Sequence, residues 1–349
     1  MSKLLYAQEI LADASQRLTP DLFDALGVPE KNLEMYHAVK GFIFPKKPGK
    51  RLRPAEVLQT VRAYGLVDVI NAYWAASSIE IDHNKLLMWD DIQDESRTRR
   101  GEICLYLIHG VDKVINFAAW LGEKAKRAIE LEFEDGYVDL RDYYRLAKEQ
   151  REQSQITAEG QDYEFCVRRK PLADATEEET EIIQRKKTAR YTVVTPFVYG
   201  AIISGITNKE IEKLKPSLEE LGVAFQITDD ALDCLGYLNK DWAGDLEEGK
   251  RTRHLVRTYQ QANARERQLI DRWVGQKGPD GRFLLEDKLE VKKEIIAIMD
   301  KYGEIASCRK IARQKTKGAL QVLRENLPET EETQGLLNLY RFAAASRRK

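Results

Sequence analysis

Residues 86–94 read Leu-Leu-Met-Trp-Asp-Asp-Ile-Gln-Asp, an apolar run that continues into three aspartates. The segment 223–233 reads Val-Ala-Phe-Gln-Ile-Thr-Asp-Asp-Ala-Leu-Asp and repeats the spacing D-D-x-x-D. The residues around both clusters favour helix. Side chains four residues apart share one face of a helix, so Asp90 projects with Asp94, and Asp229 projects with Asp233. The sequence therefore predicts two helices that each present a pair of carboxylates.

Like charges at this spacing destabilise a helix, so something must compensate them. A single D-D-x-x-D on a highly charged chain is most simply a solvated helix face. Two copies, each continuing an apolar run, favour a different reading, because solvated faces rarely lie where a helix is being buried. Mg²⁺ takes oxygen ligands and often uses one or two carboxylates together with substrate phosphates. Two such clusters predict a metal-dependent site for a diphosphate.

Basic segments accompany both clusters. Arg97-Thr98-Arg99-Arg100-Gly101 follows the first, the segment 244–252 with Lys250 and Arg251 follows the second, and Gly49-Lys50-Arg51-Leu52-Arg53-Pro54 lies upstream. Each alone is typical of a solvated surface. Guanidinium groups also bind phosphate through two hydrogen bonds. Beside metal-type carboxylates, they favour phosphate as the ligand.

The composition sets limits on the function. The chain has 349 residues, with 56 Lys+Arg against 57 Asp+Glu and 43% hydrophobic residues. This apolar fraction excludes general disorder, and a net charge of −1 argues against a nucleic-acid binder. Cys104, Cys166, Cys234 and Cys308 form no disulfide-like framework. With no apparent signal peptide or transmembrane segment, we expect a cytoplasmic protein.

The spacing of apolar residues and prolines favours helices throughout. After Pro54 the next proline is Pro171, and period-2 alternation is hard to find between them. Ile129, Phe133, Tyr137, Leu140 and Tyr144 recur at helical steps. The segment 168–181 predicts a loop that leads into a helix at about Asp174. We predict one large all-α domain over residues 1–349.

The order of these motifs resembles the trans-isoprenyl diphosphate synthases, the family of farnesyl and geranylgeranyl diphosphate synthases. The resemblance runs from about residue 40 to 260 and also includes Gly160-Gln161, Lys187-Thr188 and Phe225-Gln226. It implies an isoprenoid synthase fold, an all-α bundle around a central cavity, in a homodimer. It also implies condensation of isopentenyl diphosphate with dimethylallyl, geranyl or farnesyl diphosphate.

The resemblance implies a role for particular residues. Three Mg²⁺ ions would be bound, with Mn²⁺ as the alternative metal. Their ligands would come from the two clusters and from a third carboxylate position outside them: Asp90, Asp91, Asp94, Asp229, Asp230, Asp233, and either Glu164 or Asp162. The allylic diphosphate would be bound by Arg99, Gln161, Lys187 and Lys240, with Lys250 at the entrance. Isopentenyl diphosphate would be bound by Lys50, Arg53, His83 and Arg100.

The chemistry that the resemblance implies begins when the allylic C–O bond ionises to a carbocation. The second substrate's double bond attacks this cation, and a proton is lost to the departing diphosphate. Asp90, Asp229 and Lys187 would assist the ionisation, and Thr188 and Gln226 would stabilise the cation by their dipoles. Water must be excluded, which suits an enclosed helical cavity.

The chain departs from the family pattern at three places. Glu164 or Asp162 replaces the aspartate of Gly-Gln-x-x-Asp, and Tyr106 stands where many members have His. The positions that limit product length, four and five before the first cluster, are Leu86 and Lys85. We hypothesise that Lys85, paired with Asp82 on one helix face, blocks the product tunnel and favours a fifteen-carbon product. The alternatives are that Lys85 faces solvent or a dimer interface.

Four further points stay open in the sequence. The string around His83 and Asn84 also looks like some geranylgeranyl synthases, so the product is farnesyl or geranylgeranyl diphosphate. A class I terpene cyclase also uses an aspartate-rich helix, but its second metal motif normally differs, and it needs no isopentenyl site. A silent partner subunit typically lacks one cluster. The basic end, 347–349, either closes over the diphosphate or stays disordered.

Overall fold

The computed structural model describes residues 3–29, 31–66, 68–236, 242–286 and 288–346. Within these ranges the chain is helical apart from turns, loops, an isolated β-bridge and one short antiparallel hairpin, which confirms the all-α prediction. No helix in the described ranges combines the length and the apolar character needed to cross a bilayer.

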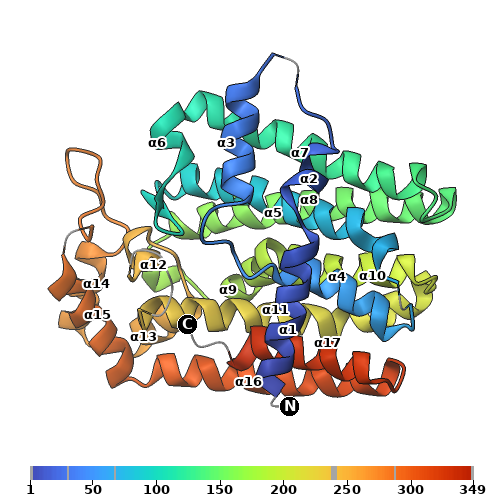
Figure 1. Cartoon of the computed structure of the whole chain (residues 1–349). Coiled ribbons are helices and arrows are strands. Elements are labelled where there is room, and N and C mark those ends of the chain that lie inside the picture. Colours follow the sequence, from blue (N-terminus) through green and yellow to red (C-terminus); the bar gives the residue numbers. More distant parts are fainter. Residues whose placement is uncertain (1–2, 30, 67, 237–241, 287, 347–349) are drawn as a thin grey trace. The chain divides into compact units, whose positions relative to one another are not determined.

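Figure 1 shows the elements in their order along the chain. The α-helices are α1 (Lys3–Arg17), α2 (Pro20–Asp24), α3 (Leu33–Ile43), α4 (Leu52–Ala63), α5 (Tyr73–Gln93), α6 (Leu105–His109), α7 (Val111–Glu134), α8 (Leu140–Arg168), α9 (Glu177–Ile183), α10 (Thr195–Ile203), α11 (Asn208–Cys234), α12 (Gly244–Glu247), α13 (Arg253–Gln261), α14 (Ala264–Trp273), α15 (Leu289–Lys301), α16 (Glu304–Asn326) and α17 (Glu331–Arg341). Ile70–Ala72 and Leu172–Asp174 form 3₁₀ turns, Gln184–Val194 and Phe342–Ser346 are π-helical, and the strands are β1 (Thr98–Arg99) and β2 (Glu102–Ile103).

The chain divides into two compact units. The first unit comprises Met1–Ser154, Tyr191–Leu218 and Leu320–Phe342. The second unit comprises Gln155–Arg190, Glu219–Ala319 and Ala343–Lys349. The first aspartate cluster belongs to the first unit and the second cluster to the second unit. The assignment of 1–349 to a single domain stays a prediction.

Helix α5 forms the centre of the first unit and packs along α7 (Figure 1). Small side chains of α7, including Ala118, Ala125 and Ala128, are fully buried and allow the close approach. Helix α4 packs against α1, α10 and α17. The start of α5 is fixed by Glu132 of α7, whose Oε1 accepts from the backbone N–H of Ala75 at 2.6 Å. This carboxylate satisfies a first-turn N–H that the helix itself leaves without an acceptor.

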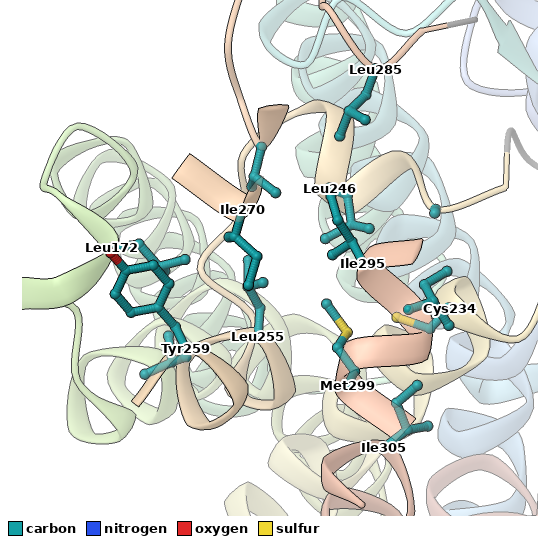
Figure 2. Close-up of a cluster of buried hydrophobic side chains, with 14 of the residues drawn as sticks. Leu172, Cys234, Leu246, Leu255, Tyr259, Ile270, Leu285, Ile295, Met299 and Ile305 are labelled. Carbon is teal, nitrogen blue, oxygen red and sulfur yellow. The ribbon is translucent and has the colours of Figure 1, made fainter. Parts of the chain in front are cut away.

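The second unit has its own apolar core between α13, α14 and α15. Figure 2 shows Leu255, Ile270, Leu285, Ile295 and Met299 directed into this cluster. Capping boxes begin two of its helices, with Thr176 and Glu179 at α9 and Asn263 and Glu266 at α14.

The π-helix Gln184–Val194 was not anticipated from the sequence. It ends just before Pro196, which has no N–H to continue a helical ladder. In the second unit two glycines let other helices approach it closely. A Cβ on Gly160 would lie 2.4 Å from the backbone N of Lys187, and one on Gly222 would lie 2.3 Å from the Cβ of Ala189. Gly160 and Gly222 therefore fix the position of the segment that carries Lys187.

Two element boundaries are sharper in the structure than in the sequence. The residues with helical spacing in 129–144 belong to two helices, because α7 ends at Glu134 and Gly136 adopts a positive φ of 76° before α8 begins. The helix expected at about Asp174 begins at Glu177. The hydroxyl of Thr176 accepts from the N–H of Glu179 and sets this start.

Candidate active site

The first aspartate cluster ends α5. Asp90 lies in the last turn of the helix and is half-buried, and Asp94 is the residue that caps its C-terminal end and is buried. Asp91 is buried and is engaged by Arg99, whose Nε donates to Asp91 Oδ1 at 2.6 Å. The Nη2 of Arg99 also lies 3.6 Å from Asp90 Oδ2. Burial raises the pKa of Asp91 even though Arg99 opposes the shift.

A tight hairpin positions the two arginines that follow the cluster. Thr98 pairs with Ile103 and Arg99 with Glu102, which leaves Arg100 and Gly101 as the two loop residues. Both have positive φ, 57° for Arg100 and 83° for Gly101, as a type I′ turn requires. Glycine suits the second position because it adopts positive φ without strain. The string Arg-Arg-Gly is therefore a turn that directs two neighbouring guanidiniums differently.

The residues predicted to bind isopentenyl diphosphate gather in the first unit. His83 is half-buried on α5, and its pKa is held well below the usual range, first by burial and then by Arg53 and Arg100. Burial also lowers the pKa of Arg100. Gly49 allows this guanidinium to approach, since a Cβ there would lie 2.9 Å from Arg100 Nη2. Lys50 is exposed, and its ammonium lies 5.5 Å from the ring centre of Phe342.

In the second unit a chain of hydrogen bonds connects three predicted residues. The Thr188 hydroxyl donates to Gln226 Oε1 at 2.8 Å, and Gln226 Nε2 donates to Asp230 Oδ1 at 2.6 Å. Gln184 Nε2 contacts the other oxygen of Asp230 at 3.3 Å. Asp230 thus orients an amide beside the half-buried Asp229, and Thr188 fixes the amide from the other side.

The two candidates for the third carboxylate lie in different surroundings. Glu164 is buried, and its Oε2 accepts from Lys187 Nζ at 2.9 Å, while its other oxygen is bound by Arg168. Asp162, two residues earlier on α8, is exposed. Only Glu164 is brought to Lys187, which favours it over Asp162.

The remaining predicted residues of the second unit flank this group. Asp233 is buried and its Oδ2 accepts from the N–H of Asp245 at 3.1 Å, near the start of α12. Lys250 forms an ion pair with Glu248 and lies 3.4 Å from Asp245 Oδ1. The side-chain amide nitrogen of Gln161 is buried and donates no hydrogen bond among the described residues. Lys240 and the basic end 347–349 lie outside the residues that the structure describes.

The comparison with known proteins decides the family. The profile described as Polyprenyl synthetase matches residues 39–288, well over half of the chain. The chain belongs to the polyprenyl synthetase family. It is 31% identical over 344 residues to the all-trans-nonaprenyl-diphosphate synthase (geranyl-diphosphate specific) of Rhodobacter capsulatus, with 97% of each chain covered. It is 29% identical over 292 residues to the geranylgeranyl diphosphate synthase of Saccharolobus solfataricus, with 82% of each covered.

A solved structure agrees. The geranylgeranyl pyrophosphate synthetase of Pyrococcus horikoshii matches with a TM-score of 0.81 and 28% identity, over 96% of this chain and 98% of that one. This polyprenyl synthetase therefore has the isoprenoid synthase fold and is a prenyltransferase.

The donor chemistry of this polyprenyl synthetase fits a hard cation. No three His, Cys, Asp or Glu side chains of the described ranges converge as a closed metal site. Mg²⁺ does not need one, because it commonly combines one or two carboxylates with water and substrate phosphates. Asp90 with Asp94 supplies such a pair in the first unit, and Asp229 with Asp233 supplies one in the second.

The predicted pairing of Lys85 with Asp82 is confirmed. Lys85 is 7% exposed and Asp82 is 3% exposed, and the ammonium bonds Asp82 Oδ1. The side chain of Lys85 packs on Gly122 of α7, where a Cβ would lie 3.1 Å from its Cδ, and its Nζ lies 5.3 Å from the Trp89 ring centre. Lys85 does not face solvent, and Leu86 is half-buried beside it.

Sequence reasoning missed several polar residues that support the site. Gln184 and Tyr191 contact predicted site residues but belong to no quoted motif, and Arg168 and Asp245 lie in quoted segments without having been given a role at the site. Tyr191 and Thr192 follow Lys187 at helical steps of four and five, which is the one signal that pointed to their segment. The change to a π-helix determines which way they point, and the sequence does not reveal it.

Proposed function

We propose that this polyprenyl synthetase catalyses the Mg²⁺-dependent head-to-tail (1′–4) condensation of isopentenyl diphosphate with an allylic diphosphate. The products are a short-chain all-trans prenyl diphosphate and diphosphate. The allylic substrate is dimethylallyl, geranyl or farnesyl diphosphate. The observation that carries the proposal is the cluster of Arg53 and Arg100 around His83, whose pKa burial and these guanidiniums hold well below the usual range, so that the imidazole is neutral beside two cations. It suits a second diphosphate bound directly by the protein.

The carboxylates and cations share the allylic diphosphate. Asp90, Asp94 and Asp229 are the proposed principal ligands of Mg²⁺, which when bound neutralises the leaving diphosphate and so favours ionisation of the C–O bond. Lys187 donates to the same leaving group. Its ammonium is held by Glu164 at 2.9 Å, which supports a defined position for it.

The carbocation is stabilised by fixed dipoles. Gln226 Oε1 and the Thr188 hydroxyl are tied together at 2.8 Å, and Asp230 holds the amide of Gln226. Dipoles held in place need no reorganisation as charge develops on the substrate. The double bond of isopentenyl diphosphate then attacks the cation, and the departing diphosphate takes the proton that is lost.

The product length rests on this chain's own residues, since the named products of its relatives differ. We propose that the buried Lys85–Asp82 pair limits the product to farnesyl diphosphate, with geranylgeranyl diphosphate the next candidate. A tunnel floor made by an ion pair resists an apolar chain end, because entry of that chain would displace charges that cannot be resolvated.

The enzyme is proposed to act as a homodimer in the cytoplasm. Apolar side chains are exposed on β2, α6 and the start of α7: Ile103, Leu107, Ile108, Val111 and Ile115. An apolar surface of this kind is typical of a subunit interface. Sedimentation of the Ile108→Lys variant beside the parent chain tests it, since a dimer through this surface is expected to dissociate.

The function is tested by sizing products. The enzyme is incubated with isopentenyl diphosphate, each allylic starter in turn, and Mg²⁺, Mn²⁺ or a chelator. Condensation products that require both substrates and the metal are expected. Diphosphate release without isopentenyl diphosphate indicates a cyclase instead. Turnover that survives both Asp94→Ala and Asp229→Ala contradicts the proposed site, and Asp162→Ala serves as the exposed carboxylate control for Glu164→Ala.

A further inference from the structure

The two arginines of Gly-Lys-Arg-Leu-Arg have opposite surroundings in the first unit. Arg51 is buried and forms an ion pair with Glu80, at 2.5 Å between Nη1 and Oε1. Its Nη2 also donates to the carbonyl of Ile43 at 2.6 Å. The charge of Arg51 is therefore matched within the fold, which gives this side chain a structural role.

Arg53, two residues later, is almost equally buried but is held by neutral groups. Its Nη2 donates to the hydroxyl of Thr192 at 2.8 Å, and its guanidinium carbon lies 4.5 Å from the ring centre of Tyr191. In the part of the chain that the structure describes, Arg53 makes no ion pair, and its Nε has no hydrogen-bond partner. Glu56, one turn further along α4, is a buried carboxyl group close enough to Arg53 to interact with it, but burial raises its pKa well above the usual range, which favours its neutral form. A buried cation without an ionised partner is costly unless something else stabilises it.

The ring of Tyr191 also contacts His83. The two rings stack with centroids 5.8 Å apart and planes inclined by 27°. The Nδ1 of His83 is buried without a partner among the described residues. One tyrosine thus contacts two of the groups proposed to bind isopentenyl diphosphate, and each of these groups keeps a nitrogen available for hydrogen bonding.

We propose that Tyr191 is a positioning residue for the isopentenyl diphosphate site, which holds Arg53 and His83 in place without neutralising the guanidinium. An aromatic face attracts a cation through its quadrupole but carries no net charge. A carboxylate in the same place would fix Arg53 equally well and would cancel the charge that an incoming diphosphate needs. The inference rests on the proposed function, because it assigns Arg53 to that substrate.

The π-helix makes this arrangement available. Tyr191 and Thr192 are adjacent residues, yet both reach Arg53. A π-helix has more residues per turn than an α-helix, so the angle between consecutive side chains is smaller and two adjacent residues can contact the same group. The π-helix here has a definite consequence: it supplies Arg53 with a ring and a hydroxyl.

The test compares Tyr191→Phe with Tyr191→Leu. The KM for isopentenyl diphosphate and its equilibrium binding by calorimetry are measured beside the KM for geranyl diphosphate. Tyr191→Leu is expected to weaken the binding of isopentenyl diphosphate by about 2- to 30-fold, which is the range that the loss of a cation–π contact supports. The KM for geranyl diphosphate is expected to change less than about twofold. Tyr191→Phe keeps the ring and is expected to stay within about twofold of the parent enzyme.

Controls separate position from stability. Tyr144→Leu makes the same change at a tyrosine of the first unit that is 64% exposed, and it is expected to alter neither constant. If Tyr191→Leu does not fold, Tyr191→Met fills the site and carries the same measurement. The inference is overturned if both KM values rise equally in Tyr191→Leu. It is also overturned if Tyr191→Phe binds isopentenyl diphosphate as weakly as Tyr191→Leu does. An unchanged isopentenyl KM in Arg53→Ala instead refutes the proposed pocket itself.

Discussion

Removing the ammonium of Lys85 is expected to change both stability and product length. Lys85 and Asp82 are each less than a tenth exposed and bond one another, while Asp82 Oδ2 has no other partner among the described residues. Lys85→Ala would leave a buried carboxylate without its counter-ion, which costs about 3–5 kcal/mol. At about 2 °C per kcal/mol for a chain of this size, Tm should fall by roughly 6–10 °C.

A double variant removes this penalty and isolates the effect on the product. Asp82→Asn with Lys85→Met removes both charges and keeps the volume, so Tm should stay near that of the parent. Asp82→Asn with Lys85→Ala removes the volume as well. Both are incubated with isopentenyl diphosphate and dimethylallyl diphosphate, and the products are sized by chromatography after removal of the diphosphate.

The two double variants distinguish charge from bulk. If bulk limits the chain, only the Ala variant should extend the product by one or more isoprene units. If the charge limits the chain length, both double variants should give a longer product. An unchanged product distribution in the Ala double variant, with Tm close to the parent value, refutes the idea that Lys85 limits the product.

Three further predictions concern the helix contacts and the metal. Gly160→Ala places a Cβ 2.4 Å from the backbone N of Lys187, so activity and Tm should both fall, whereas the matched Gly318→Ala, with nothing within 4 Å, should leave both near the parent values. Burial raises the pKa of Glu132 to about 8, above the unfolded value of 4.5, so the folded state holds the extra proton between these values. The free energy of unfolding should therefore fall, on the order of a few kcal/mol, as pH rises from about 4.5 to 8. Glu132→Gln keeps the hydrogen bond to the N–H of Ala75 and should remove this pH dependence, which denaturant titrations at several pH values would measure. With a chelator, calorimetry should show that allylic diphosphate binding is lost while isopentenyl diphosphate binding changes less than about twofold, and equal loss of both would contradict direct binding by the cationic pocket.

The all-α fold and the helical placement of both aspartate clusters were predictable from the sequence. Apolar runs that pass directly into D-D-x-x-D specify a buried helix, and Asp90 lies in its last turn with Asp94 at its C-terminal cap. The i,i+3 spacing of Asp82 and Lys85 likewise predicted their contact, because local helix geometry fixes the distance between such side chains.

Long-range contacts were not predictable in the same way. Nothing local in the sequence shows that Arg51 meets Glu80, or that Arg53 meets Thr192, which lies 139 positions away. The π-helix was missed because no motif in the sequence marks it, and propensity carries no information about close tertiary approaches such as those of Gly160 and Gly222 to this segment. The break between α7 and α8 is different, since Gly136 is a helix-ending signal that is visible in the sequence.

The charges around the site support two different ways of recognising a diphosphate. In the allylic set, Arg99 bonds Asp91 and Lys187 bonds Glu164, so the cations are largely balanced by carboxylates of the fold. A set that is balanced in this way attracts a polyanion strongly only when divalent metal adds positive charge. Arg53 is held by a ring and a hydroxyl instead, and among the described residues no ion pair offsets its charge. A net charge of −1 is therefore compatible with the two proposed diphosphate sites, because the sign of the local charge, and not the sum, determines what each site attracts.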